Sequence, residues 1–214
     1  MDPSPTETQC IAARLNDLLA EAGQPALSGQ VAEQFAAYCA LLMRWNARTN
    51  LTAIRDEEGI LRRHFVESIA CARALPAGIG SLLDFGSGAG FPGLPIALCR
   101  PEISVMLAES QNKKAAFLRE AVRTLDLGAA VHSGRAESLS QTFDCVTLRA
   151  VDRMERGIQV AVGLVRGGGC LAVLTTAADV ALTRAAADSD FAWAEPVFLI
   201  PGTERVLLVG HLAG

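Results

Sequence analysis

One short segment, LLDFGSGAGFPGLPIAL at residues 82–98, combines an acid with closely spaced glycines. Asp84 stands two residues before the first of three glycines, at positions 86, 88 and 90. Glycines that follow a strand let the backbone pass close to a bound ligand, and the helix that follows completes a cofactor loop. Starting from Gly88, the segment also matches the G-x-G-x-x-G pattern of dinucleotide-binding loops. The segment therefore predicts a cofactor loop and leaves two classes of cofactor to be distinguished.

The position of the glycines favours the frame that starts at Asp84. In the dinucleotide pattern the first glycine makes the tight turn directly after the strand, but here Gly86 already occupies that place and Pro92 falls in the first helical turn. The other frame is that of a loop wrapping the amino-acid part of S-adenosylmethionine, which needs close backbone approach and an acid near its ammonium group. Asp84 is the candidate for that acid, directly or through water. Two alternatives stay open: a turn carboxylate at Asp84, and a nucleotide-binding module of the NAD type.

Two later segments add cofactor candidates. Glu109 ends the next predicted strand, 19 residues after Gly90, where an acid at the carboxyl edge of a sheet binds both ribose hydroxyls. NAD enzymes use an acid in the same way, and a charge complementing a helix N-terminus is the structural alternative. Ala136 and Glu137, in GRAESL after the third strand, are candidates to face the adenine.

The elements that must position these residues change character near residue 80. Before it, apolar residues at spacings of three and four predict helices over 7–23, 28–46 and about 57–74, with Ser28 as an N-cap. After it, helical stretches alternate with short apolar runs at 81–85, 103–109, 129–133, 143–150, 169–175, 191–200 and 204–212. Such alternation predicts a mostly parallel sheet with helices on both faces.

The end of the chain specifies the fold further. The last two expected strands are joined by only Pro201, Gly202 and Thr203, too few residues for a parallel crossover, so they must form an antiparallel hairpin. Five parallel strands followed by such a hairpin outline the seven-stranded, Rossmann-like sheet of class I S-adenosylmethionine-dependent methyltransferases. We therefore expect an α/β protein: a helical extension over residues 1–75, packed on a methyltransferase domain over residues 76–214.

Composition limits other functions. No apolar run approaches the roughly 20 residues of a membrane span, and the N-terminus lacks the features of a secretory signal, so we expect a cytoplasmic protein that does not enter a membrane. The six cysteines form no C-x-x-C pair, which argues against a disulfide framework and a zinc site, and no metal is expected. The net charge of -4 disfavours a nucleic-acid partner, but QNKKAAFLREAVR carries four basic residues against one acid.

Several segments occur together in a familiar order: RWNARTNLTAI, RHFVESI, LLDFGSGAGFPGLPIALCRPE, ESQNKKAAFLREAV, GRAE and TLRAV. Over about residues 30–210 the chain thereby resembles the bacterial small-subunit ribosomal RNA guanine-N7 methyltransferases, also called glucose-inhibited division protein B. The W-N-x-x-x-N-L-T stretch and the G-x-P-G-x-P continuation of the glycine loop are the most specific motifs. The resemblance implies S-adenosylmethionine as cofactor and N7-methylguanosine in the 530 loop of 16S ribosomal RNA as product.

The resemblance also implies roles for individual residues. The cofactor contacts that it implies, together with Gly88 of the same loop, are Gly86, Phe91, Ala136, Glu137 and Arg149. Arg149 closes the fourth strand and is the expected positioning residue, able to contact both the cofactor and guanine O6. Its structural alternative is an arginine that caps the sheet edge with a salt bridge.

Two departures from the family pattern are present, one at a pair of residues and one at a single residue. Thr175 and Thr176 stand where a Lys-Gly pair is common, which removes a candidate contact to the RNA or the target base. Glu67 stands where Asp is common, a smaller change.

Methyl transfer to N7 makes modest chemical demands. N7 of guanine has an in-plane lone pair and no proton, so an in-line approach needs positioning and electrostatics but no general base. The chain lacks the N/D-P-P-Y element of exocyclic-amine methyltransferases and any Pro-Cys that would attack a pyrimidine C5. These absences agree with N7 as the target.

The substrate side is expected to combine the helical extension with the basic helix. The candidate residues are Asn50, Thr52, Arg62, Arg63, His64, Lys113 and Lys114, with Arg119 as a further phosphate ligand. A structural role for His64 and a solvated face for the lysines are the alternatives. We expect a monomer acting on 16S ribosomal RNA or the small ribosomal subunit, the alternative being a methyltransferase of a small molecule or protein.

Overall fold

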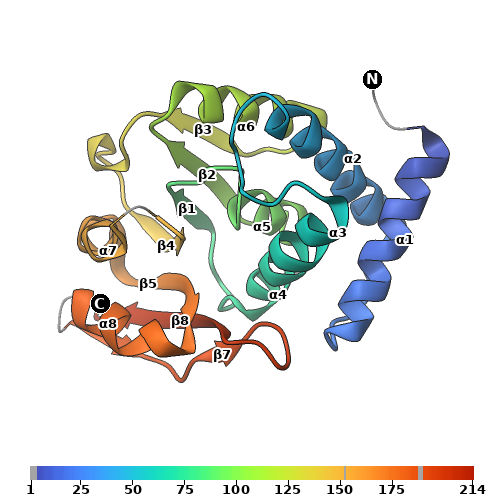
Figure 1. Cartoon of the computed structure of the whole chain (residues 1–214). Helices are drawn as coiled ribbons and strands as arrows, with labels where there is room; N and C mark the ends of the chain where they lie inside the picture. Colours follow the sequence, from blue (N-terminus) through green and yellow to red (C-terminus); the bar gives the residue numbers. More distant parts are fainter. Residues whose placement is uncertain (1–3, 152, 188–189) are drawn as a thin grey trace.

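The strands form one sheet in which the parallel part comes first along the chain. The computed structural model describes residues 4–151, 153–187 and 190–214. Within them the strands are β1 (Ser81–Phe85), β2 (Ser104–Glu109), β3 (Ala130–Ser133), β4 (Phe143–Arg149), β5 (Val165–Thr176), β6 (Phe191–Trp193), β7 (Val197–Phe198) and β8 (Arg205–Leu212). Their order is β3-β2-β1-β4-β5-β8-β6, with β7 also paired to β8 (Figure 1). β1 to β5 pair in parallel, and β8 is antiparallel to β5.

The predicted methyltransferase sheet is confirmed, with one difference in detail. The strand expected over 191–200 is divided into β6 and β7, which pair with different parts of β8, so the described sheet has eight strands. Pro196 lies in the break, and proline has no backbone N–H to donate to a neighbouring strand. The antiparallel hairpin at the end of the chain is therefore β7 and β8.

The helices alternate with the strands after a helical start. They are α1 (Pro5–Glu21), α2 (Gly29–Asn46), α3 (Glu57–Ile60), α4 (Glu67–Ala74), α5 (Gly93–Cys99), α6 (Asn112–Thr124), α7 (Met154–Val162) and α8 (Val180–Ala186). Short 3-10 turns cover Ala136–Ser138 and Ala177–Asp179. Ser28 takes the N-cap position of α2, but its side chain makes no capping hydrogen bond.

The helix expected over 57–74 is continuous but irregular. Between α3 and α4 the chain forms a π-helical segment, Leu61–Val66. Such wide turns are rare and occur frequently at functional sites. This segment contains Arg63 and His64, and it lies next to the end of β4, as described below.

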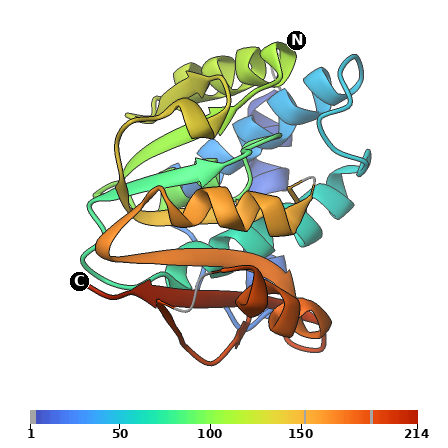
Figure 2. The ribbon, with the colours of Figure 1, turned by 90° about the vertical axis from the view of Figure 1, so that its left-hand side faces the viewer.

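Two apolar layers cover the sheet because its buried strands direct alternate side chains to opposite faces. In β1, Leu82 packs in the layer formed with α1, α2, α4, α5 and α6, whereas Leu83 packs in the layer that includes Ile158 of α7. Figure 2 shows α7 crossing in front of the sheet, with the first helices behind it. The helical extension therefore shares its core with one face of the sheet, and a division at residues 75 and 76 remains a prediction.

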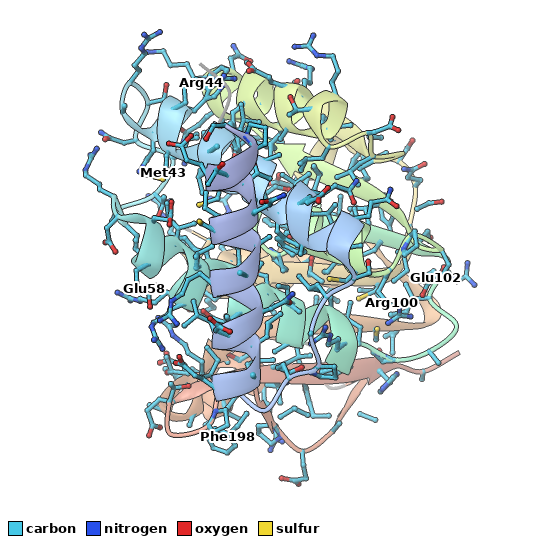
Figure 3. All side chains as sticks on the ribbon, turned by 90° about the vertical axis from the view of Figure 1, so that its right-hand side faces the viewer. Met43, Arg44, Glu58, Arg100, Glu102 and Phe198 are labelled. Atoms are coloured by element: carbon cyan, nitrogen blue, oxygen red, sulfur yellow. The ribbon has the colours of Figure 1, made fainter. Side chains whose placement is uncertain are left out.

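Ion pairs hold α1 on the outside of this layer. Arg14 binds Glu58 at 2.7 Å, and Arg62 binds Glu58 at 2.7 Å and Glu21 at 2.9 Å. Figure 3 looks onto this surface, where Glu58 lies beside α1. Arg62 is thus directed to α1 and is not part of the cavity described below.

Candidate functional site

A cavity of about 500 Å³ opens at the carboxyl ends of the parallel strands. The loops after β1, β2, β3 and β4 form most of its wall, and the helical extension supplies the rest. Its lining residues are Leu51, Thr52, His64, Phe85, Gly86, Ser87, Gly88, Ala89, Phe91, Ala108, Glu109, Ser110, Gln111, Lys114, Gly134, Arg135, Ala136, Glu137, Arg149, Ala150 and Val151. Ligands of open α/β sheets bind in this place.

The glycine loop is held in a shape that side chains disfavour. Gly86, Gly88 and Gly90 all have positive φ angles, of 69°, 57° and 92°. A Cβ on Gly90 would lie within 3 Å of Leu94 and of the hydroxyl of Tyr38, whereas a Cβ on Gly88 would meet only a backbone oxygen at 3.8 Å. Gly90 is therefore required for packing behind the loop, while Gly88 keeps its cavity side open.

Asp84 supports this loop from behind, as its turn-carboxylate alternative describes, and a contact with the cofactor, directly or through water, stays a prediction. Its side chain is fully buried and does not line the cavity. One carboxylate oxygen accepts from the Thr147 hydroxyl at 2.9 Å and the other from the Gly93 amide at 3.2 Å. Burial raises the pKa of Asp84 to about 6, against the lowering effect of these hydrogen bonds. Asp84 thus acts as the turn carboxylate, fixing the start of α5 against β4.

Glu109 lies in the cavity wall at the end of β2, where a residue that binds the ribose hydroxyls was expected. Its side chain is buried, and its two oxygens accept from the amides of Gly88 at 3.0 Å and Gln111 at 2.7 Å. A carboxylate has about four acceptor positions, so these two bonds leave capacity for a ligand's hydroxyls. Glu109 therefore joins the glycine loop to the next loop while still presenting acceptor positions at the cavity.

Phe91 belongs to an aromatic cluster under the cavity. Its ring centroid is 4.6 Å from that of His64 and 5.4 Å from that of Tyr38, in stacked orientations. The Tyr38 hydroxyl donates to the carbonyl of Ala89 at 2.5 Å, which ties α2 to the glycine loop. Phe91 lines the cavity but is mostly buried, so little of its side chain is exposed there.

Arg149 joins the end of β4 to the helical extension. Its side chain is 13% exposed and forms an ion pair at 2.8 Å with Glu67, which is 5% exposed. It also donates to the Arg63 carbonyl at 2.7 Å and the Ser68 hydroxyl at 3.2 Å. Burial lowers the pKa of the guanidinium, and the Glu67 carboxylate opposes that shift. The salt-bridge alternative is thus realised, although Arg149 still lines the cavity.

His64 lies between Arg149 and Thr52. Its Nδ1 is 3.2 Å from an Arg149 nitrogen and its Nε2 is 2.7 Å from the Thr52 hydroxyl. Because the guanidinium can only donate, Nδ1 accepts, and Nε2 must carry the proton in the neutral ring. Burial and the nearby guanidinium of Arg149 lower the pKa of His64 to about 3. His64 is therefore a neutral imidazole that links Arg149 and Thr52 through hydrogen bonds at its two nitrogens.

The other residues predicted for the substrate side are dispersed. Thr52 and Lys114 line the cavity, and Arg63 lines a neighbouring one. Asn50 lies outside the cavity and accepts from Arg55 at 2.8 Å. Lys113 is exposed and outside the cavity.

Ala136, Glu137 and Arg119 complete the predicted set. Ala136 and Glu137 line the cavity from the 3-10 turn after β3. Arg119 lies outside it and donates to the Ser133 hydroxyl.

Sequence reasoning overlooked the residues that shape the loop of the W-N-x-x-x-N-L-T motif. Buried Asn46 accepts from the amides of Leu51 and Thr52 at 2.9 and 3.0 Å and donates to the Ile54 carbonyl at 3.0 Å. Trp45 donates to Glu120 of α6 at 3.1 Å. The motif's tryptophan and first asparagine therefore position the loop, while its threonine reaches the cavity. An asparagine at a helix end, whose side chain readily bonds nearby backbone groups, was the available signal.

Neither a metal cluster nor a membrane-spanning helix occurs within the described residues. Within 4–151, 153–187 and 190–214, no group of three or more His, Cys, Asp or Glu side chains is placed to hold a metal ion. In the same part of the chain, no helix is both long and apolar enough to cross a membrane.

Comparisons with known proteins identify relatives. The family model described as GidB, rRNA small subunit methyltransferase G, matches residues 31–194. A protein named Ribosomal RNA small subunit methyltransferase G from Roseiflexus sp. (strain RS-1) is 52% identical over 126 residues, which are 56% of this chain and 54% of that protein. The protein of the same name from Roseiflexus castenholzii (strain DSM 13941 / HLO8) is 44% identical over 161 residues, 72% of this chain and 69% of that protein.

A solved structure adds evidence on the fold. Cofactor-bound Rv0187 from MTB superposes with a TM-score of 0.58 at 18% identity, covering 84% of this chain and 89% of that one. The chain spans only 54% of the first relative's length, so the comparison is with part of that protein. The family match nevertheless covers most of this chain and confirms the resemblance drawn from its motifs. The chain belongs to the GidB family, described as rRNA small subunit methyltransferase G.

Proposed function

We propose that this chain transfers a methyl group from S-adenosylmethionine to N7 of a guanosine in the 530 loop of 16S ribosomal RNA. The observation that carries the proposal is the glycine-loop cavity at the carboxyl ends of β1 to β4, found in a member of a ribosomal RNA methyltransferase family. S-adenosylmethionine supplies an electrophilic methyl group on a sulfonium. The residues of this chain then have to bind it, orient it and admit the base.

The residues present fit this cofactor. The cavity of about 500 Å³ lies within the roughly 300–1,000 Å³ of small-molecule sites. Gly86 and Gly88 give the amino-acid part close access to backbone, Glu109 offers acceptors for the ribose hydroxyls, and Ala136 with Glu137 borders the adenine. No helix N-terminus with free amides is needed, because this ligand has no phosphates.

The ionisable groups agree with a reaction that needs no general base. His64 is neutral, and its two nitrogens are engaged by Arg149 and Thr52. N7 has no proton to lose, so the protein contributes mainly alignment. Arg149 is the proposed positioning residue, because it lines the cavity and its location is fixed by Glu67, Ser68 and the Arg63 carbonyl. Residues 1–75 then contribute one wall of the site and are more than a packing extension.

A basic rim beside the cavity supports an RNA substrate. Arg135, Arg153 and Arg156 surround a small cavity that adjoins the first one at Phe85 and Val151. None of the three forms an ion pair with another described residue. Guanidinium groups bind phosphates well. We therefore propose that the RNA backbone contacts this rim and Lys114, in place of Lys113 and Arg62.

The test is methylation of small ribosomal subunits with labelled S-adenosylmethionine, followed by chemical cleavage at N7-methylguanosine. We expect one labelled guanosine in the 530 loop with subunits, or with naked 16S RNA if assembly is not required. Labelling of protein or small molecules alone would overturn the RNA assignment. Calorimetry tests the cofactor separately: binding of NAD without binding of S-adenosylhomocysteine would overturn the cofactor assignment. The predicted monomer and the cytoplasmic location stay predictions.

A further inference from the structure

A second cavity, of about 280 Å³, lies on the other side of Arg149. It shares His64, Arg149 and Ala150 with the first cavity and extends along the ends of β5 and β8. Its other lining residues are Ile54, Arg63, Glu67, Met154, Leu174, Thr175, Thr176, Asp179 and Arg205. Its volume is just below the roughly 300–1,000 Å³ of sites for whole drug-sized ligands, so it suits a single flat heterocycle.

Polar groups without a complete set of partners face this cavity. Thr175 is 8% exposed, yet its hydroxyl has no hydrogen-bond partner among the described residues. The hydroxyl oxygen keeps some accessible surface. Asp179 accepts from the Thr176 hydroxyl at 2.6 Å through one oxygen, and its other oxygen has no partner in the described part of the chain. Thr175 is a buried residue, where polar groups are normally satisfied, so its hydroxyl indicates a ligand. Asp179 is exposed, and its second oxygen is an acceptor available in the cavity wall.

We propose that the second cavity holds the target guanine and that the Asp179 carboxylate accepts hydrogen bonds from its N1–H and N2 amino group. The inference rests on the proposed function and assigns its base-specificity residue. In guanine, N7 and O6 share one edge, while N1–H and the N2 amino group lie on another. A base whose N7 faces the first cavity past Arg149 turns its N1 and N2 edge away from that cavity, toward Asp179 in the wall of the second one. The Thr175 hydroxyl is then free to donate to O6.

The order of residues along the sheet edge agrees with this placement. Arg149 is opposite Leu174 in the register of β4 and β5, and Thr175, Thr176 and Asp179 follow farther from the first cavity. The Thr176 hydroxyl holds Asp179 in place by its hydrogen bond. The pair Thr175 and Thr176, which departs from the family's Lys-Gly, thus becomes part of a base-recognition group.

The hydrogen-bonding groups in the cavity wall distinguish guanine from adenine. Arg205 is opposite Thr176 in the register of β8 and β5, and it lies 4.0 Å from Glu67. Three guanidinium groups, of Arg63, Arg149 and Arg205, line the cavity with two carboxylates, and Glu67 pairs with Arg149 and Arg205. The Asp179 carboxylate is the acceptor that selects a base with N–H donors. Adenine is disfavoured, because its N1 is an acceptor that would face the Asp179 carboxylate and it has no amino group at C2.

The experiment replaces the methylated guanosine by inosine, which lacks only the N2 amino group. Small-subunit RNA carrying guanosine or inosine at the mapped position is made by splinted ligation, assembled into subunits and assayed for kcat/KM. We expect the unchanged protein to prefer guanosine by roughly 10-fold, as for other discriminating contacts to a base edge. Asp179→Ala should lower kcat/KM on guanosine and reduce the preference to about 1, since neither base then has its partner.

Glu195→Ala is the matched control. Glu195 is exposed and lines neither cavity, so its variant should keep the preference of the unchanged protein. If Asp179 only stabilised its turn, Asp179→Ala would lower activity on both RNAs equally and keep the preference, and that result would overturn the inference. Equal methylation of guanosine and inosine RNA by the unchanged protein would overturn it too. No methylation of guanosine RNA would remove the proposed function and, with it, this assignment.

Discussion

Replacing Arg149 by methionine tests whether β4 and the helical extension are held together at one buried ion pair. Arg149→Met keeps most of the side-chain volume but leaves the Glu67 carboxylate, 5% exposed, with Arg205 at 4.0 Å as its remaining ion-pair partner among the described residues. Removing one member of a buried pair typically costs about 3–5 kcal/mol. For a chain of 150–250 residues, 1 kcal/mol corresponds to roughly 2–4 °C, so Tm should fall by roughly 6–20 °C.

The second variant separates charge burial from lost packing. Arg149→Met combined with Glu67→Met removes both charges, and apolar replacement of a whole buried pair is often neutral or stabilising. The double variant should therefore be more stable than Arg149→Met alone. The part not recovered measures the lost bonds to the Arg63 carbonyl, Ser68 and His64.

Thermal and urea unfolding followed by circular dichroism supply the measurement. Arg205→Met is the control, because its side chain is 45% exposed and 4.0 Å from Glu67, so it should cost no more than about 1 kcal/mol. An Arg149→Met loss below about 1 kcal/mol, or a double variant no more stable than the single one, would refute the reasoning.

Further variants test the cofactor loop and its titrating groups. Tyr38→Phe leaves the Ala89 carbonyl without its donor, so we expect a loss of about 1–3 kcal/mol in urea unfolding and weaker binding of S-adenosylhomocysteine by calorimetry. Gly90→Ala should cost more than about 1 kcal/mol and abolish that binding, whereas Gly168→Ala, also at positive φ but with open space around it, should lose only backbone energy and bind normally. Because burial raises the pKa of Asp84 to about 6, the folded protein keeps a proton that the unfolded chain releases, and this stability is lost as pH rises from about 4 to 6; urea midpoints of Asp84→Asn should lack that decline. The pKa of His64 is lowered to about 3, so its contribution has the opposite sign: it is lost as pH falls from about 6.5 to 3, and His64→Gln should remove that loss.

The sequence predicted the parts of this molecule that depend on local pattern. The runs at 81–85 and 103–109 become β1 and β2 almost residue for residue, because a buried parallel strand needs a continuous apolar stretch and little else. The glycine loop was also predictable. The positive φ angles at Gly86, Gly88 and Gly90 favour glycine, so the sequence itself indicates where the backbone takes this conformation.

What the sequence could not predict depends on distant partners. Whether Asp84 faces the ligand or the loop is decided by Thr147, 63 residues away on the neighbouring strand. The neighbours Arg62 and Arg63 were predicted to act together, but Arg62 binds Glu21 and Glu58 while Arg63 lines the second cavity. They are separated because the helix that contains them packs against α1 on one side and lies beside the end of β4 on the other. Residue spacing in the sequence does not reveal these tertiary contacts.

Because of the π-helical segment, the number of residues between α3 and α4 determines how the two helices are rotated relative to each other. An α-helix advances about 100° per residue, so removing one residue within Leu61–Val66 would restore a regular helix and rotate everything before it relative to α4. His64 and the Arg63 carbonyl would then lose their alignment with Arg149, while the helix itself became more regular. A chain shortened in this way should still unfold cooperatively. The wall that His64 and Arg149 form between its two cavities would, however, be broken. One apparently surplus residue in this helix therefore aligns His64 and the Arg63 carbonyl with Arg149, and so joins the walls of the two cavities.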